Sequence, residues 1–364
     1  MGPLGEEVRA APTESEIANL KRLAAGIIKS QGNRFVKELL RNKDIRIGEN
    51  KNDFERNLTE AIQTGALRLD DVKNWLKDVE GWGNQHVYLY KISTTLRKDL
   101  TKPKIRARVE SAGLKELWDK ETVLEFPDEP QLSSIAFDDL ALRLLWQESS
   151  PGWTAEPEKN YEKEEGLDMY EYRAYRKIET RAITRFEAHL DTGIAGLFIA
   201  NPIQDEEHQK AFNKAKRVIG LLMNFQSLER AQVDISAVSR NLDQGNIPNS
   251  NNQVPEVKAQ RSRLASGGAY VEFAANSKDK AYWEEPAIQN VRKAVKTQQL
   301  KAFHGGDGVF NFQASSDPGG LTRTLRVQLY GDGNRVRLWA QMNADEVWTI
   351  LAKLCRYETV GRQA

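Results

Sequence analysis

The sequence predicts an α+β protein, with an N-terminal helical module followed by two α/β units that combine antiparallel strands with packed helices. Two observations predict this class. Apolar residues recur at helical spacing as far as about residue 80, and from Tyr170 onward alternating strand patterns and helical patterns are joined by short turns. A chain of 364 residues is long enough for two or three domains with ordinary cores.

Residues 13–92 are expected to form the helical module. Thr13 and Glu16 have the spacing of a capping box, and an apolar stripe at helical spacing follows them. Three shorter amphipathic segments come next, and Gly65 and Gly81 lie where two of them should stop. The module therefore contains four expected helices, and the strand pattern "HVYLYKIS" leads out of it.

The two α/β units are expected at residues 93–245 and 260–360. The first contains an acidic loop at 147–168, followed by strand patterns and two helices. Residues 246–259 are rich in Asn, Pro, Ser and Gln without periodicity, which predicts a linker. The second unit alternates strands and a helix, then ends in a hairpin and a helix capped by Asn343.

The two units share an order of elements. Residues 185–207 and 326–348 each read as strand, Asp/Gly turn, strand, polar corner and acid-capped helix. A distant duplication explains this order. Independent use of the common hairpin-then-helix unit also explains it, and the sequence favours this second explanation because the unit is widespread.

The composition sets limits on compartment and chemistry. The 53 basic and 52 acidic residues nearly cancel, so an argument for nucleic acid must come from local patches. The single cysteine, Cys355, excludes a disulfide framework within the chain and suits a reducing compartment, and no apolar run is long enough for a membrane span. We expect a cytoplasmic protein without membrane contact, cofactor or metal, since the four histidines show no metal-ligand spacing.

Residues 33–64 carry a helix–turn–helix pattern with basic residues at the second helix. The positions that carry it are Val36, Lys37, Leu39, Leu40, Ile45, Ile47, Gly48, Lys51, Phe54, Arg56 and Leu58. This segment resembles the SAP family of small DNA-binding modules, although Phe35 and Val36 replace a leucine and four acids intrude. The resemblance implies that Arg46, Asn50, Lys51 and Arg56 contact the phosphate backbone of duplex DNA at a helix start. A plain helical hairpin with solvated charges is the alternative.

The hairpin at residues 324–342 has an unusual polar face. A two-residue period places Arg326, Tyr330, Arg335, Arg337 and Trp339 on one side of it. Guanidinium groups suit phosphates, and the rings offer a surface to a base or sugar. Crowded arginines repel one another unless an anion neutralises their charges, so we expect that an anionic partner binds this face. The alternative is that acids of residues 156–171 or of the closing helix cover this face.

These observations predict a non-enzymatic protein that binds double-stranded DNA largely without reading its sequence. One alternative is a scaffold for homo-oligomer or protein–protein assembly, because Arg and Trp also dominate protein interfaces. Another is a metal-dependent nuclease, in which the dispersed carboxylates Glu187, Asp191 and Glu272 would converge.

Overall fold

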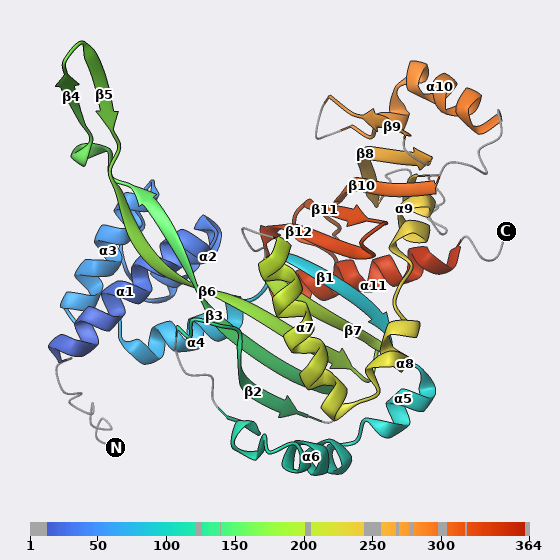
Figure 1. Cartoon of the computed structure of the whole chain (residues 1–364), viewed down its shortest axis with the longest axis horizontal. Coiled ribbons are helices and arrows are strands. Elements are labelled where there is room, and N and C mark those ends of the chain that lie inside the picture. Colours follow the sequence, from blue (N-terminus) through green and yellow to red (C-terminus); the bar gives the residue numbers. More distant parts are fainter. Residues whose placement is uncertain are drawn as a thin grey trace, which may run out of the picture. The chain divides into compact units, whose positions relative to one another are not determined.

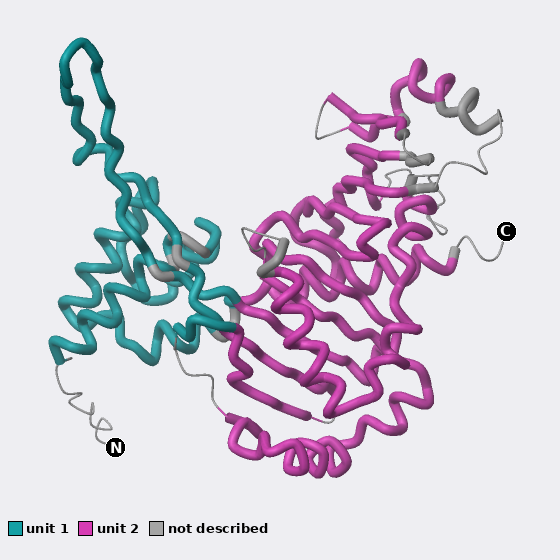
Figure 2. The backbone as a smooth tube through the Cα atoms, viewed as in Figure 1, with its two compact units in different colours: residues 1–80, 124–129, 148–182 teal, residues 81–123, 130–147, 183–364 magenta. Residues whose placement is uncertain are grey.

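The computed structural model describes most of the chain as two compact units. The described residues are 13–120, 126–138, 140–200, 205–243, 256–266, 269–276, 280–297, 304–316 and 319–360. Unit 1 comprises residues 1–80, 124–129 and 148–182, and unit 2 comprises residues 81–123, 130–147 and 183–364 (Figure 2). The predicted α+β class is confirmed, because N-terminal helices precede a large antiparallel sheet with further helices (Figure 1).

Unit 1 begins with the helical module. Its helices are α1 (Glu14–Ser30), α2 (Asn33–Asn42), α3 (Lys51–Gln63) and α4 (Leu69–Val79). Thr13 and Glu16 make the expected reciprocal bonds before α1, with Glu16 N–H donating to the Thr13 hydroxyl at 3.2 Å and Thr13 N–H donating to the Glu16 carboxylate at 2.9 Å. The apolar stripes of the four helices pack into one cluster, in which Leu40, Phe54, Leu58 and Ile62 are fully buried.

Unit 1 also contains a separate two-stranded hairpin, where the sequence predicted an acidic loop. Its strands are β4 (Tyr161–Glu165) and β5 (Asp168–Tyr172), and a 3-10 turn at Pro157–Lys159 precedes it. Every residue of both strands is exposed. In Figure 1 this hairpin projects beyond the helices of its unit.

Unit 2 is built on most of a ten-stranded sheet with the order β2-β3-β6-β7-β1-β12-β11-β10-β8-β9. The strands are β1 (Gly83–Lys91), β2 (Gln131–Phe137), β3 (Ala141–Ala155), β6 (Tyr175–His189), β7 (Ile194–Ala200), β8 (Val257–Ser266), β9 (Ala269–Ala274), β10 (His304–Phe312), β11 (Leu325–Tyr330) and β12 (Arg335–Gln341). The ends of β3 and β6 continue into unit 1. The helices are α5 (Thr94–Asp99), α6 (Lys102–Ser111), α7 (Asp205–Leu222), α8 (Phe225–Arg230), α9 (Ile235–Asp243), α10 (Pro286–Thr297) and α11 (Ala344–Val360), with 3-10 turns at Lys115–Leu117 and Tyr282–Glu284.

The strand β1 has four strands of the sheet on one side and five on the other. On one side lie β7, β6, β3 and β2, and the chain leaves β7 into α7; on the other side lie β12, β11, β10, β8 and β9, and the chain leaves β12 into α11. Both β7 and β12 run antiparallel to β1. The two hairpin-then-helix segments noted in the sequence therefore flank β1 on its two sides. We call the strands on the β7 side the first half and those on the β12 side the second half.

The two helices cover opposite faces of the sheet. Side chains of α7 pack with Phe186, Leu197 and Leu144 on one face, and side chains of α11 pack with Val327, Leu338 and Phe198 on the other. We call these the α7 face and the α11 face; in Figure 1, α7 crosses one side of the strands and α11 the other. A half-turn about the axis of β1 exchanges β7 with β12 and α7 with α11, and it also exchanges the two faces.

Three expected boundaries differ from the structure. The strand β1, placed with the helical module by the boundary at residue 92, forms the centre of the sheet in unit 2 because both of its edges are paired. The two expected α/β units share this one sheet. Residues 246–255 of the expected linker lie outside the described residues, while residues 257–259 begin β8 because Val257 and Ala259 enter the core. Among the described residues, no helix is both long and apolar enough to span a bilayer.

Candidate nucleic-acid interface

The Arg-aromatic hairpin predicted at residues 324–342 is formed by β11 and β12. Gln328 pairs with Arg337 and Tyr330 with Arg335 across the two strands, and Asn334 adopts a positive φ of 45° in the turn. The alternating residues Val327, Leu329, Val336 and Leu338 enter the core beneath α11. Strand alternation therefore places all five predicted residues, Arg326, Tyr330, Arg335, Arg337 and Trp339, together on the α7 face.

Neighbouring strands extend this face. In β8, Arg261 pairs with Val309 of β10, and Val309 pairs with Gln328 of β11, which continues the row to Arg337. Arg263 lies two residues further along β8 and opposite Glu272 of β9. We call the resulting set the arginine platform, with the members Arg261, Arg263, Tyr270, Arg326, Tyr330, Arg335, Arg337 and Trp339. None of them joins a hydrophobic cluster of the described residues.

Four of the five platform arginines stack on aromatic rings. The Cζ atoms of Arg337 and Arg326 lie 3.8 and 5.4 Å from the centroid of Trp339. The Cζ atom of Arg335 lies 5.0 Å from Tyr330, and that of Arg263 lies 3.8 Å from Tyr270. An exposed cation–π contact stabilises by about 0.5–1 kcal/mol, enough to restrict a guanidinium group while leaving its N–H edge available to a ligand.

The described carboxylates form no ion pair with the arginines of the β11–β12 hairpin. Within the described part of the chain, no acid forms an ion pair with Arg326, Arg335 or Arg337, and Glu346 of the closing helix binds Arg323 instead, at 3.0 Å. Asp307 is the acid directly opposite Tyr330 in β10. Burial raises the pKa of Asp307, and the charges of Arg263 and Arg261 oppose this rise only in part.

The four residues suggested by the SAP resemblance have different surroundings. Asn50 caps α3, since its side-chain oxygen accepts from the N–H of Asp53 at 3.0 Å. Lys51 Nζ donates to the Ile28 carbonyl in α1 at 2.9 Å, and Arg56 pairs with Asp53 at 2.8 Å. The Asp53 carboxylate thus lies where a phosphate at the start of α3 would bind.

All four residues are exposed, and Arg46 differs from the other three because its side chain makes no described contact. Only its backbone carbonyl is engaged in the described contacts, accepting from the Asn57 amide at 2.7 Å. The turn that carries Arg46 is tight: a Cβ at Gly48 would lie 2.0 Å from the Cβ of Asp53. The expected helix–turn–helix is thus present as α2, the turn and α3, and the side chains of Asn50, Lys51 and Arg56 make contacts within unit 1.

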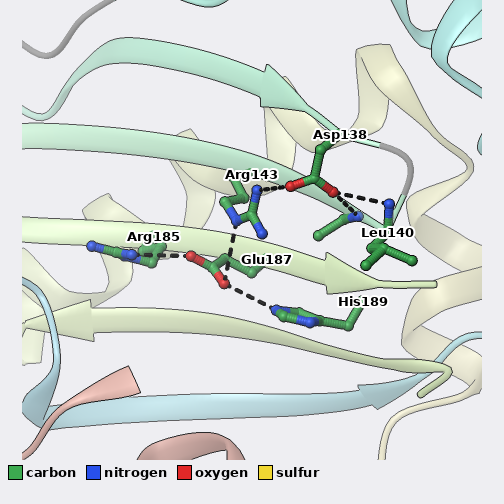
Figure 3. A network of polar contacts seen from close by, with 7 residues as sticks. Asp138, Leu140, Arg143, Arg185, Glu187 and His189 are labelled. Atoms are coloured by element: carbon green, nitrogen blue, oxygen red, sulfur yellow. Dashed lines mark hydrogen bonds and ion pairs between the residues drawn. The ribbon is translucent and has the colours of Figure 1, made fainter. Parts of the chain in front are cut away.

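The first half carries a polar network on the face opposite α7, shown in Figure 3. The buried Glu187 carboxylate lies 3.0 Å from Arg185 Nη1, 3.1 Å from His189 Nε2 and 4.0 Å from Arg143 Nε. Arg143 also pairs at 2.5 Å with Asp138, which accepts the N–H groups of Leu140 and Ala141. Every charge in the network thus has an opposite partner.

The electrostatics of Glu187 follow from these contacts. Burial alone would raise its pKa, but the hydrogen bond from His189 and the charges of Arg185 and Arg143 outweigh burial and hold the pKa below its ordinary value. The network also contacts two tryptophans. The ring centroids of His189 and Trp348 of α11 are 4.1 Å apart, and Arg185 Cζ lies 4.1 Å from the ring centroid of Trp82. It therefore fastens the first half to α11.

The carboxylates proposed for a nuclease do not converge. Glu187 belongs to β6 and Glu272 to β9, seven strands further along the sheet, a separation of about 33 Å at the usual strand spacing. The described residues contain no group of three His, Cys, Asp or Glu side chains that could hold a metal ion. Burial raises the pKa of Cys355 to about 12, so this thiol stays protonated.

Comparison of the chain with protein-family models and with curated proteins finds no match.

Proposed function

We propose that the protein binds double-stranded DNA through the arginine platform, largely without reading the base sequence and without chemistry of its own. The observation that supports this proposal is the lack of any described carboxylate partner for Arg326, Arg335 and Arg337. Like charges this close on neighbouring strands repel one another unless an anion binds them. A polyanion such as DNA supplies the missing charge.

Aromatic stacking favours phosphate contact over base contact. Trp339 has one guanidinium group directly across the hairpin and another two residues away on its own strand, at 5.4 and 3.8 Å, so cations occupy the ring surface that a base would otherwise use. Held by the ring, these groups present N–H donors that suit phosphate oxygens. Contacts of this kind position a protein on nucleic acid without carrying sequence information.

The width of the platform suits a duplex. From β8 to β12 there are three strand spacings, about 14 Å, between Arg261 on one side and Arg337 on the other. The major groove of B-DNA is about 12 Å wide, so the two rows of cations are spaced to reach both phosphate backbones across a groove. Uncharged Val309 and Asn311 lie in β10 between them.

Arg46 is the residue that we propose as a second contact from the helical module, because it is exposed and no described acid pairs with its guanidinium group. We also place the protein in the cytoplasm, consistent with its single cysteine. Neither assignment is needed for binding by the platform.

The experiment measures affinity for a random-sequence duplex by fluorescence anisotropy at several salt concentrations. We expect steep salt dependence for the unchanged protein, because each neutralised phosphate releases counterions. The double variant Arg326→Gln with Arg337→Gln should flatten the slope of log K against log salt by about two units, and Arg46→Gln by about one. Arg106→Gln on the exposed face of α6 is the matched control and should leave the slope unchanged.

Absence of binding at low salt, or equal slopes for the unchanged protein and the double variant, would rule out the platform as a DNA site. If the unchanged protein forms a stable oligomer and does not bind DNA, the scaffold function replaces this proposal.

A further inference from the structure

The β4–β5 hairpin is the most exposed part of unit 1 and is strongly apolar for its position. Its side chains include five exposed large apolar residues, namely Tyr161, Leu167, Met169, Tyr170 and Tyr172. It pairs with no other described strand, and a lone two-stranded hairpin is only marginally stable in water. Exposed apolar side chains gathered on one element indicate an interaction surface.

The strand register divides this hairpin into two faces. Tyr161 lies opposite Tyr172 on one face, and their rings stack with centroids 4.8 Å apart. On the other face Glu162 lies opposite Glu171, and Glu164 opposite Met169. The face with the tyrosines also carries Lys163, Glu165 and Asp168, and the other face carries three glutamates and Met169; we call this element the acidic hairpin.

Two acids of this hairpin, Glu162 and Glu164, have no ion-pair partner among the described residues, whereas Glu165 pairs with Lys163 at 2.6 Å. Glu162 and Glu171 are like charges directly opposite each other, an arrangement that destabilises a strand pair. Glu171 has Arg173 at 3.1 Å, whereas Glu162 and Glu164 form no ion pair among the described residues. An exposed hairpin with unanswered carboxylates and tyrosines fits a partner that offers cations and aromatic rings.

The arginine platform has this chemistry. It presents five arginines with the rings of Tyr270, Tyr330 and Trp339, of which Tyr270 is 56% and Trp339 40% exposed. Five-residue strands extend about 17 Å, and the platform measures about 14 Å across its strands, so the two surfaces agree in size as well as in charge.

We propose that the acidic hairpin of one copy docks on the arginine platform of a second copy, so that the protein self-associates through an ionic contact. DNA then competes with the hairpin for the same arginines. The competition rests on the proposed DNA-binding function, whereas the docking does not. Because hairpin and platform are different surfaces, the contact forms either reciprocally in a dimer or head to tail in longer assemblies.

The test is analytical ultracentrifugation of the full chain across a concentration series, at low and high salt. We expect the unchanged protein to self-associate at low salt and to dissociate at high salt, because charge pairs at an exposed contact are screened. The hairpin variant Glu162→Lys with Glu164→Lys, and the platform variant Arg326→Glu with Arg337→Glu, should each be monomeric alone. A mixture of the two variants should assemble, because each reversed surface then meets its opposite.

Glu38→Lys with Glu60→Lys changes the net charge equally on exposed helical positions and is the matched control, expected to associate like the unchanged protein. A monomer at every concentration, or an unchanged assembly of the hairpin variant, overturns the docking. Chemical cross-linking that joins the acidic hairpin to the arginine platform only within one molecule also overturns the docking proposal, because the hairpin would then not bind a second copy.

Measuring DNA binding by the same variants separates the docking proposal from the proposed DNA-binding function. If the docking is correct and DNA competes, the hairpin variant binds random duplex more tightly than the unchanged protein. Self-association without DNA binding by any variant removes the proposed function and leaves the docking, whereas DNA binding by a strict monomer removes the docking alone.

Discussion

The two halves of the sheet place arginines on corresponding faces, each opposite the helix of its own half, but neutralise them differently. In the first half, Arg143 and Arg185 surround the buried Glu187, and Asp138 completes the network. In the second half, Arg326 and Arg337 lie on Trp339 with no carboxylate partner among the described residues. The half-turn about β1 relates β6 to β11. Corresponding strands therefore carry crowded arginines that are paired with carboxylates in one half and stacked on an aromatic ring in the other.

This difference indicates a division of labour. A buried carboxylate that pairs with several cations holds β-strands and helix together. Removing it leaves the positive charges of those cations in a medium of low dielectric constant. Exposed or half-exposed guanidinium groups on rings contribute little to folding, and their exposed N–H groups can bind a ligand. The first half should therefore control stability and the second half binding.

The largest expected effect is that of Glu187→Ala. The substitution removes a buried carboxylate that Arg185 and His189 share, which should lower the free energy of unfolding of unit 2 by about 3–5 kcal/mol. Urea denaturation followed by tryptophan fluorescence measures the change. Arg337→Gln, on the corresponding face of the second half, should change stability by less than about 0.5 kcal/mol. Equal losses in the two variants would show that the halves do not differ as described.

A second, smaller effect is expected in the pH dependence of stability. The folded-state pKa of Glu187 lies below its unfolded value, so its contribution is complete above the unfolded value of about 4.3 and is lost as pH falls through the folded pKa. Glu187→Gln should therefore be less stable than the unchanged protein at neutral pH, with the gap narrowing below about pH 4. Parallel stability curves for the two proteins across this range would contradict the assignment.

Much of the fold could be predicted from the sequence, because it depends on local patterns. The helical stripe from Ile17 to Ile28, the cap at Asn343 and the alternation in residues 325–341 each report on contacts within one element. The same alternation placed Arg326, Arg335 and Arg337 on one face with Trp339. Tyr270 was missed, although the alternation in "AYVEF" beside the basic strand β8 indicates it.

Long-range pairing could not be predicted in this way. Nothing in "HVYLYK" shows that β1 lies between β7 and β12, because strand neighbours are set by contacts far apart in the chain. Glu187 was noted only as a scattered acid, since its partner Arg143 lies 44 positions earlier and its contact with Trp348 depends on the path of α11.

The smallest expected effect concerns the ring that holds the binding arginines. Trp339→Leu removes the surface on which Arg326 and Arg337 stack but no charge. Losing about 0.5–1 kcal/mol of cation–π stabilisation should weaken DNA binding about two- to fivefold, while the salt slope stays that of the unchanged protein. Trp339→Phe, which keeps a ring, should lose less. A loss of more than about tenfold in Trp339→Leu would mean that the ring itself contacts a base or sugar, and that the platform reads more than phosphate.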